Sequence, residues 1–126
     1  MTKEITLQGY AQLVNGRNKI KRELGSVSID QTGTDWYGPV KYVLGAGYEA
    51  VGKGDITSLG VCVLENPEAD GGENAVGSFD GGSTDHIEIE PGEFQILRLT
   101  TGYTIGNLQF KAKTSASSVV VTLLED

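Results

Sequence analysis

Cysteine, histidine and proline are scarce in this chain of 126 residues. There is one cysteine, Cys62, and one histidine, His86, beside three prolines. A single cysteine excludes an intramolecular disulfide and leaves no CxxC pair for zinc or thiol redox chemistry. A single histidine removes most constellations of metal ligands. We therefore expect no cofactor and no metal, and a fold stabilised by packing alone or with the help of oligomerisation.

Long apolar runs are also missing. The residues after Met1 do not form the apolar centre of a signal peptide, and no stretch approaches the roughly 20 apolar residues that span a bilayer. We expect a protein that is made and assembled in the cytosol and has no membrane partner.

Positive charge is in deficit, with 10 Lys and Arg against 17 Asp and Glu, a net charge of −7. Affinity for a nucleic acid comes mostly from cations that neutralise phosphates. The balance therefore argues against a nucleic-acid partner and favours a soluble, self-repelling molecule.

Glycine is abundant, with 18 residues scattered between apolar runs. Glycine at that density is typical of many short elements joined by tight turns. The length fits one domain, because single cores typically span about 100 to 150 residues. We therefore expect one β-sandwich domain over residues 1–126.

The last third of the chain has the clearest pattern. Residues 86–90 and 94–99 alternate between apolar and polar side chains, and Pro91-Gly92 joins them as the centre of a type II turn. Two more such runs predict strands at 107–113 and 117–125, with the inner side chains of the first at Leu108, Phe110 and Ala112. In all we expect about eight to ten short strands, no helix, and an antiparallel β-sandwich of jelly-roll type.

The first two thirds are less regular. A nearly continuous apolar run at 59–64 predicts a strand covered on both faces, with Cys62 in the core. Pro39 places its strand at a sheet edge or makes it a strand start. The other expected segments are strands at 5–14 (a helical turn at 11–14 being the alternative), 26–30 after Gly25, 36–44 and 48–51, and loops at 31–35 and, acidic and glycine-rich, at 69–85.

No motif predicts a reaction centre. Gly45–Ala50 matches a GxGxxA fingerprint, but the glycine-rich residues after it cannot begin the helix that receives a pyrophosphate, so we interpret it as a connection between strands. Glu88 and Glu90 share a strand face and could form a glycosidase pair; outward charges on a half-exposed strand are the simpler reading. No serine lies in GxSxG, and we expect no enzyme.

Acidic side chains gather in the segment 69–85. Asp70, Glu73, Asp80 and Asp85 could surround calcium through carboxylate oxygens. The spacing matches neither an EF-hand nor a GGxGxD repeat, so a solvated acidic loop is the preferred interpretation.

Two groups are candidates for binding a partner. The cations Arg17, Lys19, Lys21 and Arg22 form either a solvated strand face or a docking patch for an acidic partner. The aromatic residues Trp36, Tyr37 and Tyr42 form either a sugar platform or, as we prefer, packing in the core or at a subunit interface.

The spacing of several runs resembles small structural proteins of tailed bacteriophages. These runs are Tyr48-Glu49-Ala50, Leu59–Asn66, Ile87–Leu99 with its Pro-Gly-Glu turn and terminal Arg-Leu, Leu108–Lys113 with Lys-Ala, and the final Leu123-Leu124-Glu125. The acidic segment 69–85 is a departure, because the resembling proteins have a shorter, Asn-containing turn there.

The resemblance implies a jelly-roll-like virion protein, commonly trimeric, that decorates the capsid or forms part of a tail or fibre. The leading hypothesis is a capsid decoration or cement protein, a homotrimer bound to the major capsid protein. Its basic N-terminal segment, residues 1–24, would dock, with Arg17, Lys19, Lys21, Arg22 and Trp36 as binding residues. The alternative is a tail-associated module that binds a carbohydrate or receptor.

Overall fold

The computed structural model describes residues 5–29, 35–100 and 102–125. The chain divides into two compact units, residues 1–32 and 33–126, where we had expected one domain over residues 1–126. The loop expected at 31–35 lies outside the described residues except for Asp35, which belongs to no strand.

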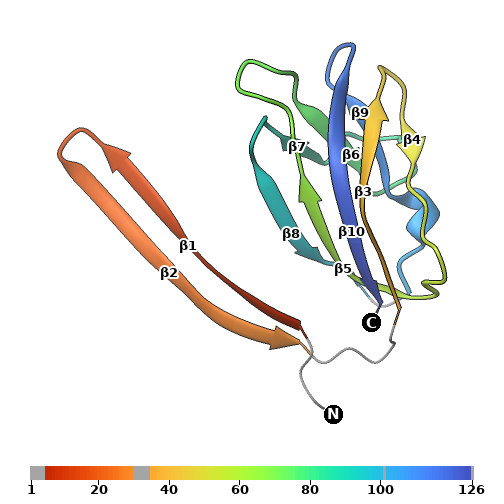
Figure 1. Cartoon of the computed structure of the whole chain (residues 1–126), viewed down its shortest axis with the longest axis horizontal. Coiled ribbons are helices and arrows are strands. Elements are labelled where there is room, and N and C mark those ends of the chain that lie inside the picture. The colour runs from red at the N-terminus through yellow and green to blue at the C-terminus, as the bar shows by residue number, and fades with distance from the viewer. Residues whose placement is uncertain (1–4, 30–34, 101, 126) are drawn as a thin grey trace. The chain divides into compact units, whose positions relative to one another are not determined.

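The first unit contains an antiparallel hairpin of two long strands, β1 (Ile5–Asn15) and β2 (Asn18–Ile29) (Figure 1). Gly16 and Arg17 form the turn, and Gly16 has φ +58°, as the first central residue of a type II′ turn requires. The expected strand at 5–14 is thereby confirmed. The break expected at Gly25 is not observed, because β2 continues through it.

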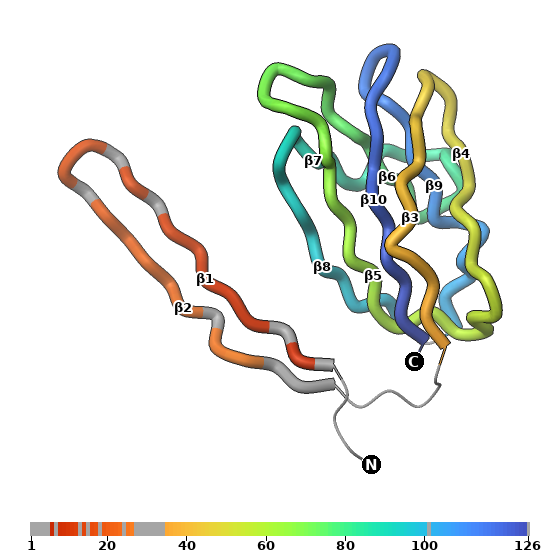
Figure 2. The backbone as a smooth tube through the Cα atoms, viewed as in Figure 1, coloured from red at the N-terminus to blue at the C-terminus, as the bar shows by residue number. Residues whose placement is uncertain are grey.

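A β-bulge explains why β2 continues through Gly25. Between Gly9 and Tyr10 the register shifts, so that Gly9 pairs with Gly25 but Tyr10 pairs with Glu23, and Gly25 has φ +71°. The extra residue, Leu24, is accommodated without ending the strand. Figure 2 follows the backbone of both strands through this region.

The second unit is an antiparallel β-sandwich of two four-stranded sheets (Figure 1). In spatial order, the first sheet contains β3 (Trp36–Leu44), β10 (Ser117–Glu125), β5 (Leu59–Glu65) and β8 (Phe94–Arg98). The second contains β4 (Glu49–Ala50), β9 (Gln109–Ala112), β6 (Ala75–Ser78) and β7 (Ile87–Ile89). A short 3-10 turn, η1 (Ile105–Asn107), precedes β9.

The strand pairing is nested. Strand β3 pairs with β10, β4 with β9, β5 with β8, and β6 with β7. This is the pattern of one long antiparallel ribbon, with its tip between β6 and β7, rolled up so that alternate pairs fall in opposite sheets. The topology is that of a jelly roll, and it confirms the expected fold class.

The core lies between the two sheets. Phe110 and Ala112 of β9 and Val119, Val121 and Leu123 of β10 are fully buried. The predicted inner face of the strand around Phe110 is therefore confirmed. Cys62 is also fully buried, and this burial raises the pKa of its thiol to about 12.

Two predicted turn and edge features are confirmed. The amide of Glu93 donates to the carbonyl of Glu90 at 2.9 Å, and Gly92 has φ +82°, as a type II turn requires. Pro39 lies in β3, which is an edge strand.

The segment 69–85 is not one loop. Strand β6 lies within it, is fully buried and pairs with both β7 and β9. The acidic and glycine-rich residues before and after β6 concealed this four-residue strand. What remains of the loop is a turn before β6 and the connection 79–86 at the tip of the rolled ribbon.

Candidate functional surfaces

The hairpin exposes every side chain that the structure describes within it. Tyr10 is 62% exposed and Ile20 is 64% exposed. The register places Ile5 opposite Ile29, and Leu13 opposite Ile20. Apolar positions therefore recur along one face of the ribbon, as in a strand pair that has one face for a partner and one for water.

The four cations predicted to bind a partner lie at the far half of the hairpin but not on one face. Arg17 is in the turn, Lys19 and Lys21 share one face by alternation, and Arg22 is on the other. The ammonium of Lys21 is 3.3 Å from the carboxylate of Glu23 and lies over the ring of Tyr10 at 4.7 Å. The hairpin thus presents positive charge on both faces of its tip.

The two units carry charges of opposite sign. Residues 1–32 hold five Lys and Arg against three Asp and Glu, a net charge of +2. Residues 33–126 hold five against fourteen, a net charge of −9. The acidic overall composition therefore conceals a basic hairpin.

The three aromatic residues expected to act together are separated by the pleat of β3. Tyr37 and Tyr42 pack against the core, and their hydroxyl groups are 2.9 Å apart. Trp36 is 73% exposed on the opposite face. The three therefore do not form one sugar platform: Tyr37 and Tyr42 pack as expected for core residues, whereas Trp36 remains available on the surface.

Trp36 belongs to a larger apolar surface on the outer face of the β3-β10-β5-β8 sheet. Val43 is 77% exposed, Phe94 66% and Ile96 38%. Alternation with the buried inner residues places further apolar side chains on the same face. We call this surface the apolar outer face, and it comprises Trp36, Val43, Val63, Phe94, Ile96, Val120 and Leu124, with Thr122 among them and Lys41, Glu65 and Arg98 near its margins. Val61 occupies the same side of β5 but is buried.

The outer face of the other sheet is charged. Tyr48 donates a hydrogen bond to Asp85, and the ammonium of Lys111 is 3.2 Å from Asp85 and 4.7 Å from the centre of the Tyr48 ring. The hydrogen bond from Tyr48 and the neighbouring Lys111 lower the pKa of Asp85. Burial, with the acceptor Asp85, raises the pKa of Tyr48.

Glu88, one of the two carboxylates considered for catalysis, belongs to the same charged face. It pairs with Lys113 and accepts a hydrogen bond from Asn74 at 2.9 Å. These contacts lower its pKa, with Lys113 the largest cause. Its observed partners are those of a carboxylate that holds β7 to the residues just after β9 and just before β6.

The acidic residues considered for calcium serve separate loops. Asp80 accepts hydrogen bonds from the hydroxyl of Ser78 at 2.7 Å and the amide of Thr84 at 2.9 Å, which lower its pKa to about 2. Glu73 accepts bonds from the amides of Thr114 and Ser115 in the turn before β10. Among the described residues, no three acidic, histidine or cysteine side chains converge as a metal site.

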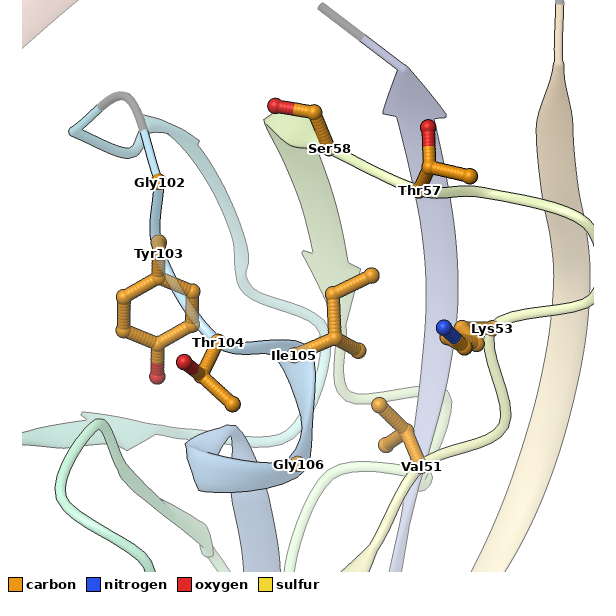
Figure 3. Close-up of a pocket in the computed structure, with 9 residues that line it drawn as sticks. All are labelled: Val51, Lys53, Thr57, Ser58, Gly102, Tyr103, Thr104, Ile105 and Gly106. Carbon is orange, nitrogen blue, oxygen red and sulfur yellow. The ribbon is translucent and has the colours of Figure 1, made fainter.

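A pocket of about 510 Å³ lies beside η1 (Figure 3). Val51, Lys53 and Ile105 border it, and Thr57 lines its rim. The amide and hydroxyl of Thr57 both donate to the buried carboxylate of Glu125, at 3.0 and 2.8 Å. The pocket therefore offers one cation and small polar groups, without an acid and base aimed at each other.

The GxGxxA run and His86 both have structural roles. The GxGxxA run leads into β4, so it connects two strands as expected. His86 accepts a hydrogen bond from the amide of Phe79 through Nδ1 at 3.1 Å, and the two rings lie 5.4 Å apart. No helix in the described part of the chain is long and apolar enough to cross a membrane.

Two polar residues escaped prediction. Asn66 is buried and donates to the carbonyls of Ile89 and Glu73, and its side-chain oxygen accepts from the amide of Glu68. The second is Glu125, whose pKa is lowered by the hydrogen bonds that Thr57 donates to its carboxylate. An asparagine just after an apolar strand and before a proline was the available signal for the first; nothing in the pattern marked the second.

Comparison with known proteins gives no match: no family model, no curated protein and no solved structure is significantly similar to this chain.

Proposed function

We propose that this chain is a virion structural protein of a tailed bacteriophage, a decoration or cement protein that binds the outside of the capsid. The proposal assigns docking to the hairpin and mechanical bridging to the sandwich. The sequence resemblance described above supports it, and so does the fold by analogy, because jelly rolls recur in viral capsid and lectin domains.

The hairpin is the observation that carries the proposal. A two-stranded hairpin is marginally stable alone in water, because it lacks a third strand or a helix to cover its apolar face. Here its described side chains are exposed, including Ile20 on the apolar face and Tyr10 and Val14 on the opposite face. Such an arm becomes favourable when a partner covers that face, and the major capsid protein is the partner we infer.

Charge specifies what that partner surface should look like. Arg17, Lys19, Lys21 and Arg22 occupy the hairpin tip, while the sandwich is strongly acidic. An acidic patch on the capsid would attract the tip and repel the sandwich, which fixes the orientation of binding. Because both charged surfaces are exposed, added salt should weaken the attraction.

The test is co-sedimentation of the purified chain with shells of the phage that encodes it, stripped of this protein. Replacing all four tip cations by glutamate should reduce occupancy at least tenfold while the circular dichroism spectrum stays unchanged. Single reversals Arg17→Glu and Lys53→Glu form a matched pair, since both side chains are exposed and only the first lies on the hairpin. Occupancy should fall for Arg17→Glu alone.

Two results would refute the proposal at different levels. Full occupancy of the fourfold variant would remove the hairpin tip as the docking element. Failure of the unaltered chain to sediment with the shells at low salt would remove the cement function itself.

The exposed indole of Trp36 supports the second candidate, a carbohydrate-binding or receptor-binding module of a tail or fibre. Aromatic faces stack on sugar rings, and this one is accessible on an edge strand. Saturable binding on a glycan array that Trp36→Ala abolishes would favour this candidate over the cement protein.

A further inference from the structure

We propose that the apolar outer face pairs with the same face of a second copy of this chain. The two-fold axis of this dimer would lie between the facing sheets of the two copies. This goes beyond the proposed docking on a capsid, which uses the hairpin. It rests on the sandwich, and it specifies a dimer where the sequence resemblance implies a trimer.

The first argument is the contrast between the two outer faces. On the side of the β4-β9-β6-β7 sheet, Lys111 of β9 pairs with Asp85, and Lys113, just after β9, pairs with Glu88 of β7. On the β3-β10-β5-β8 sheet, the corresponding central positions are Val63, Val120 and Leu124. A contiguous apolar surface on one side of a sandwich is typical of an interface, whereas paired charges are typical of a face in water.

The second argument identifies the occupant from the strand register. One row across the sheet contains Lys41, Val120, Glu65 and Phe94, and another contains Trp36, Leu124, Val61 and Arg98. On this face, each edge strand thus places one cation and one aromatic residue in the two rows, and the order is reversed between the two edges. The four corners of the face therefore alternate between positive and aromatic.

Two-fold symmetry makes this pattern complementary to itself. If the axis runs along the strands, β3 faces β8 of the second copy, and Lys41 meets Phe94 of the second copy while Trp36 meets Arg98 of the second copy. If the axis runs across the strands, Lys41 meets Trp36 of the second copy, and Phe94 meets Arg98. Either axis brings each cation to an aromatic face, which is an attractive arrangement.

Between the corners, apolar side chains meet apolar side chains. Val63 and Ile96 are adjacent in the register and lie in the middle row with Thr122. Glu65 is the last residue of β5, at the end of the sheet, where water can still reach a carboxylate. The pairing therefore buries no isolated charge in its centre.

The size of the face sets the strength of the association. Four strands about 4.8 Å apart and five to seven residues long, at about 3.3 Å per residue, cover on the order of 400 Å². A standard stable interface uses about 800 Å² per partner. We therefore expect a weak dimer that dissociates at low micromolar concentration.

The experiment is sedimentation velocity of the full chain from low micromolar to several hundred micromolar concentration. The unaltered chain should shift from monomer to dimer, and ammonium sulfate should strengthen the dimer because it favours apolar burial. Ile96→Lys should remain monomeric throughout with an unchanged thermal midpoint. Thr114→Lys, an equal charge change at an exposed turn outside this face, should dimerise normally.

The variant with four glutamates at the hairpin tip distinguishes two possible occupants of the apolar outer face: the same face of a second copy, and the hairpin of a second copy. It should dimerise like the unaltered chain, because the tip takes no part in this pairing. Loss of the dimer in that variant would make the hairpin of the second copy the occupant and overturn the proposal. A trimer, a monomer at every concentration, or a dimer that tolerates Ile96→Lys would overturn it as well.

Discussion

The hairpin and the sandwich use similar residue types in opposite ways. In the sandwich, Phe110 is fully buried at the centre of a shared core. In the hairpin, Tyr10 is 62% exposed, and the ammonium of Lys21 on the neighbouring strand lies over its ring. The sandwich uses its large side chains to stabilise itself, whereas the hairpin presents them on its surface.

The two units therefore have different roles. A sandwich with two buried inner faces is stable alone, while a two-stranded ribbon gains stability mainly from what it binds. Substitutions in the sandwich should therefore change the free energy of unfolding. Equivalent substitutions in the hairpin should change binding and leave that free energy nearly the same.

The largest expected effect tests this division with two aromatic truncations. Phe110→Ala should lower the free energy of unfolding by about 3–5 kcal/mol, because it removes a buried ring and leaves a cavity. Tyr10→Ala should change it by no more than about 0.5 kcal/mol, as for most exposed positions. Urea unfolding followed by far-ultraviolet circular dichroism measures both. Similar losses for the two variants would contradict the division of roles.

A smaller effect is expected from two polar truncations. Asn66→Ala should cost about 2–3 kcal/mol, because the carbonyl of Ile89 and the amide of Glu68 lose their buried partner. Gln12→Ala, at an exposed hairpin position, should cost no more than about 0.5 kcal/mol. The same urea titration applies. A loss below about 1 kcal/mol for Asn66→Ala would show that water replaces its hydrogen bonds.

The sequence predicted β7 and β9 well, because each alternates between core residues and more exposed polar residues. Around Phe110 the two-residue period is uninterrupted, and the Pro91-Gly92 pair supplies its own turn geometry. Strand β6 was harder, because four small residues between two acidic, glycine-rich turns carry no period of their own. Its position inside the sheet depends on β7, the next strand, and on β9, which lies further along the chain.

The surfaces were predicted less completely than the fold. The cationic residues around Lys21 are visible in the sequence, but their division between two ribbon faces follows only once β2 is known to be a strand, since neighbouring residues then alternate between faces. The apolar outer face is assembled from β3, β5, β8 and β10, and no local window contains it. Contacts between distant strands create this surface, so a local pattern could not reveal it.

The smallest effect concerns acid, and it distinguishes two carboxylates within the sandwich. Asp80 in the sandwich accepts hydrogen bonds from Ser78, Ser83 and Thr84, and its pKa is about 2 instead of the ordinary 3.8. Because the folded pKa lies below the unfolded value, this stabilisation is complete above about pH 4 and is lost as the pH falls toward 2.

Asp80→Asn should therefore lower the urea midpoint at neutral pH, and its difference from the unaltered chain should shrink steadily between pH 4 and pH 2. Asp70→Asn, in the same acidic segment but exposed, provides the matched control and should follow the unaltered chain at every pH. A gap for Asp80→Asn that stays constant down to pH 2 would mean that the neutral acid holds the loop as well as the carboxylate does. Charge would then contribute little to the connection between β6 and β7, and shape alone would hold the tip of the rolled ribbon.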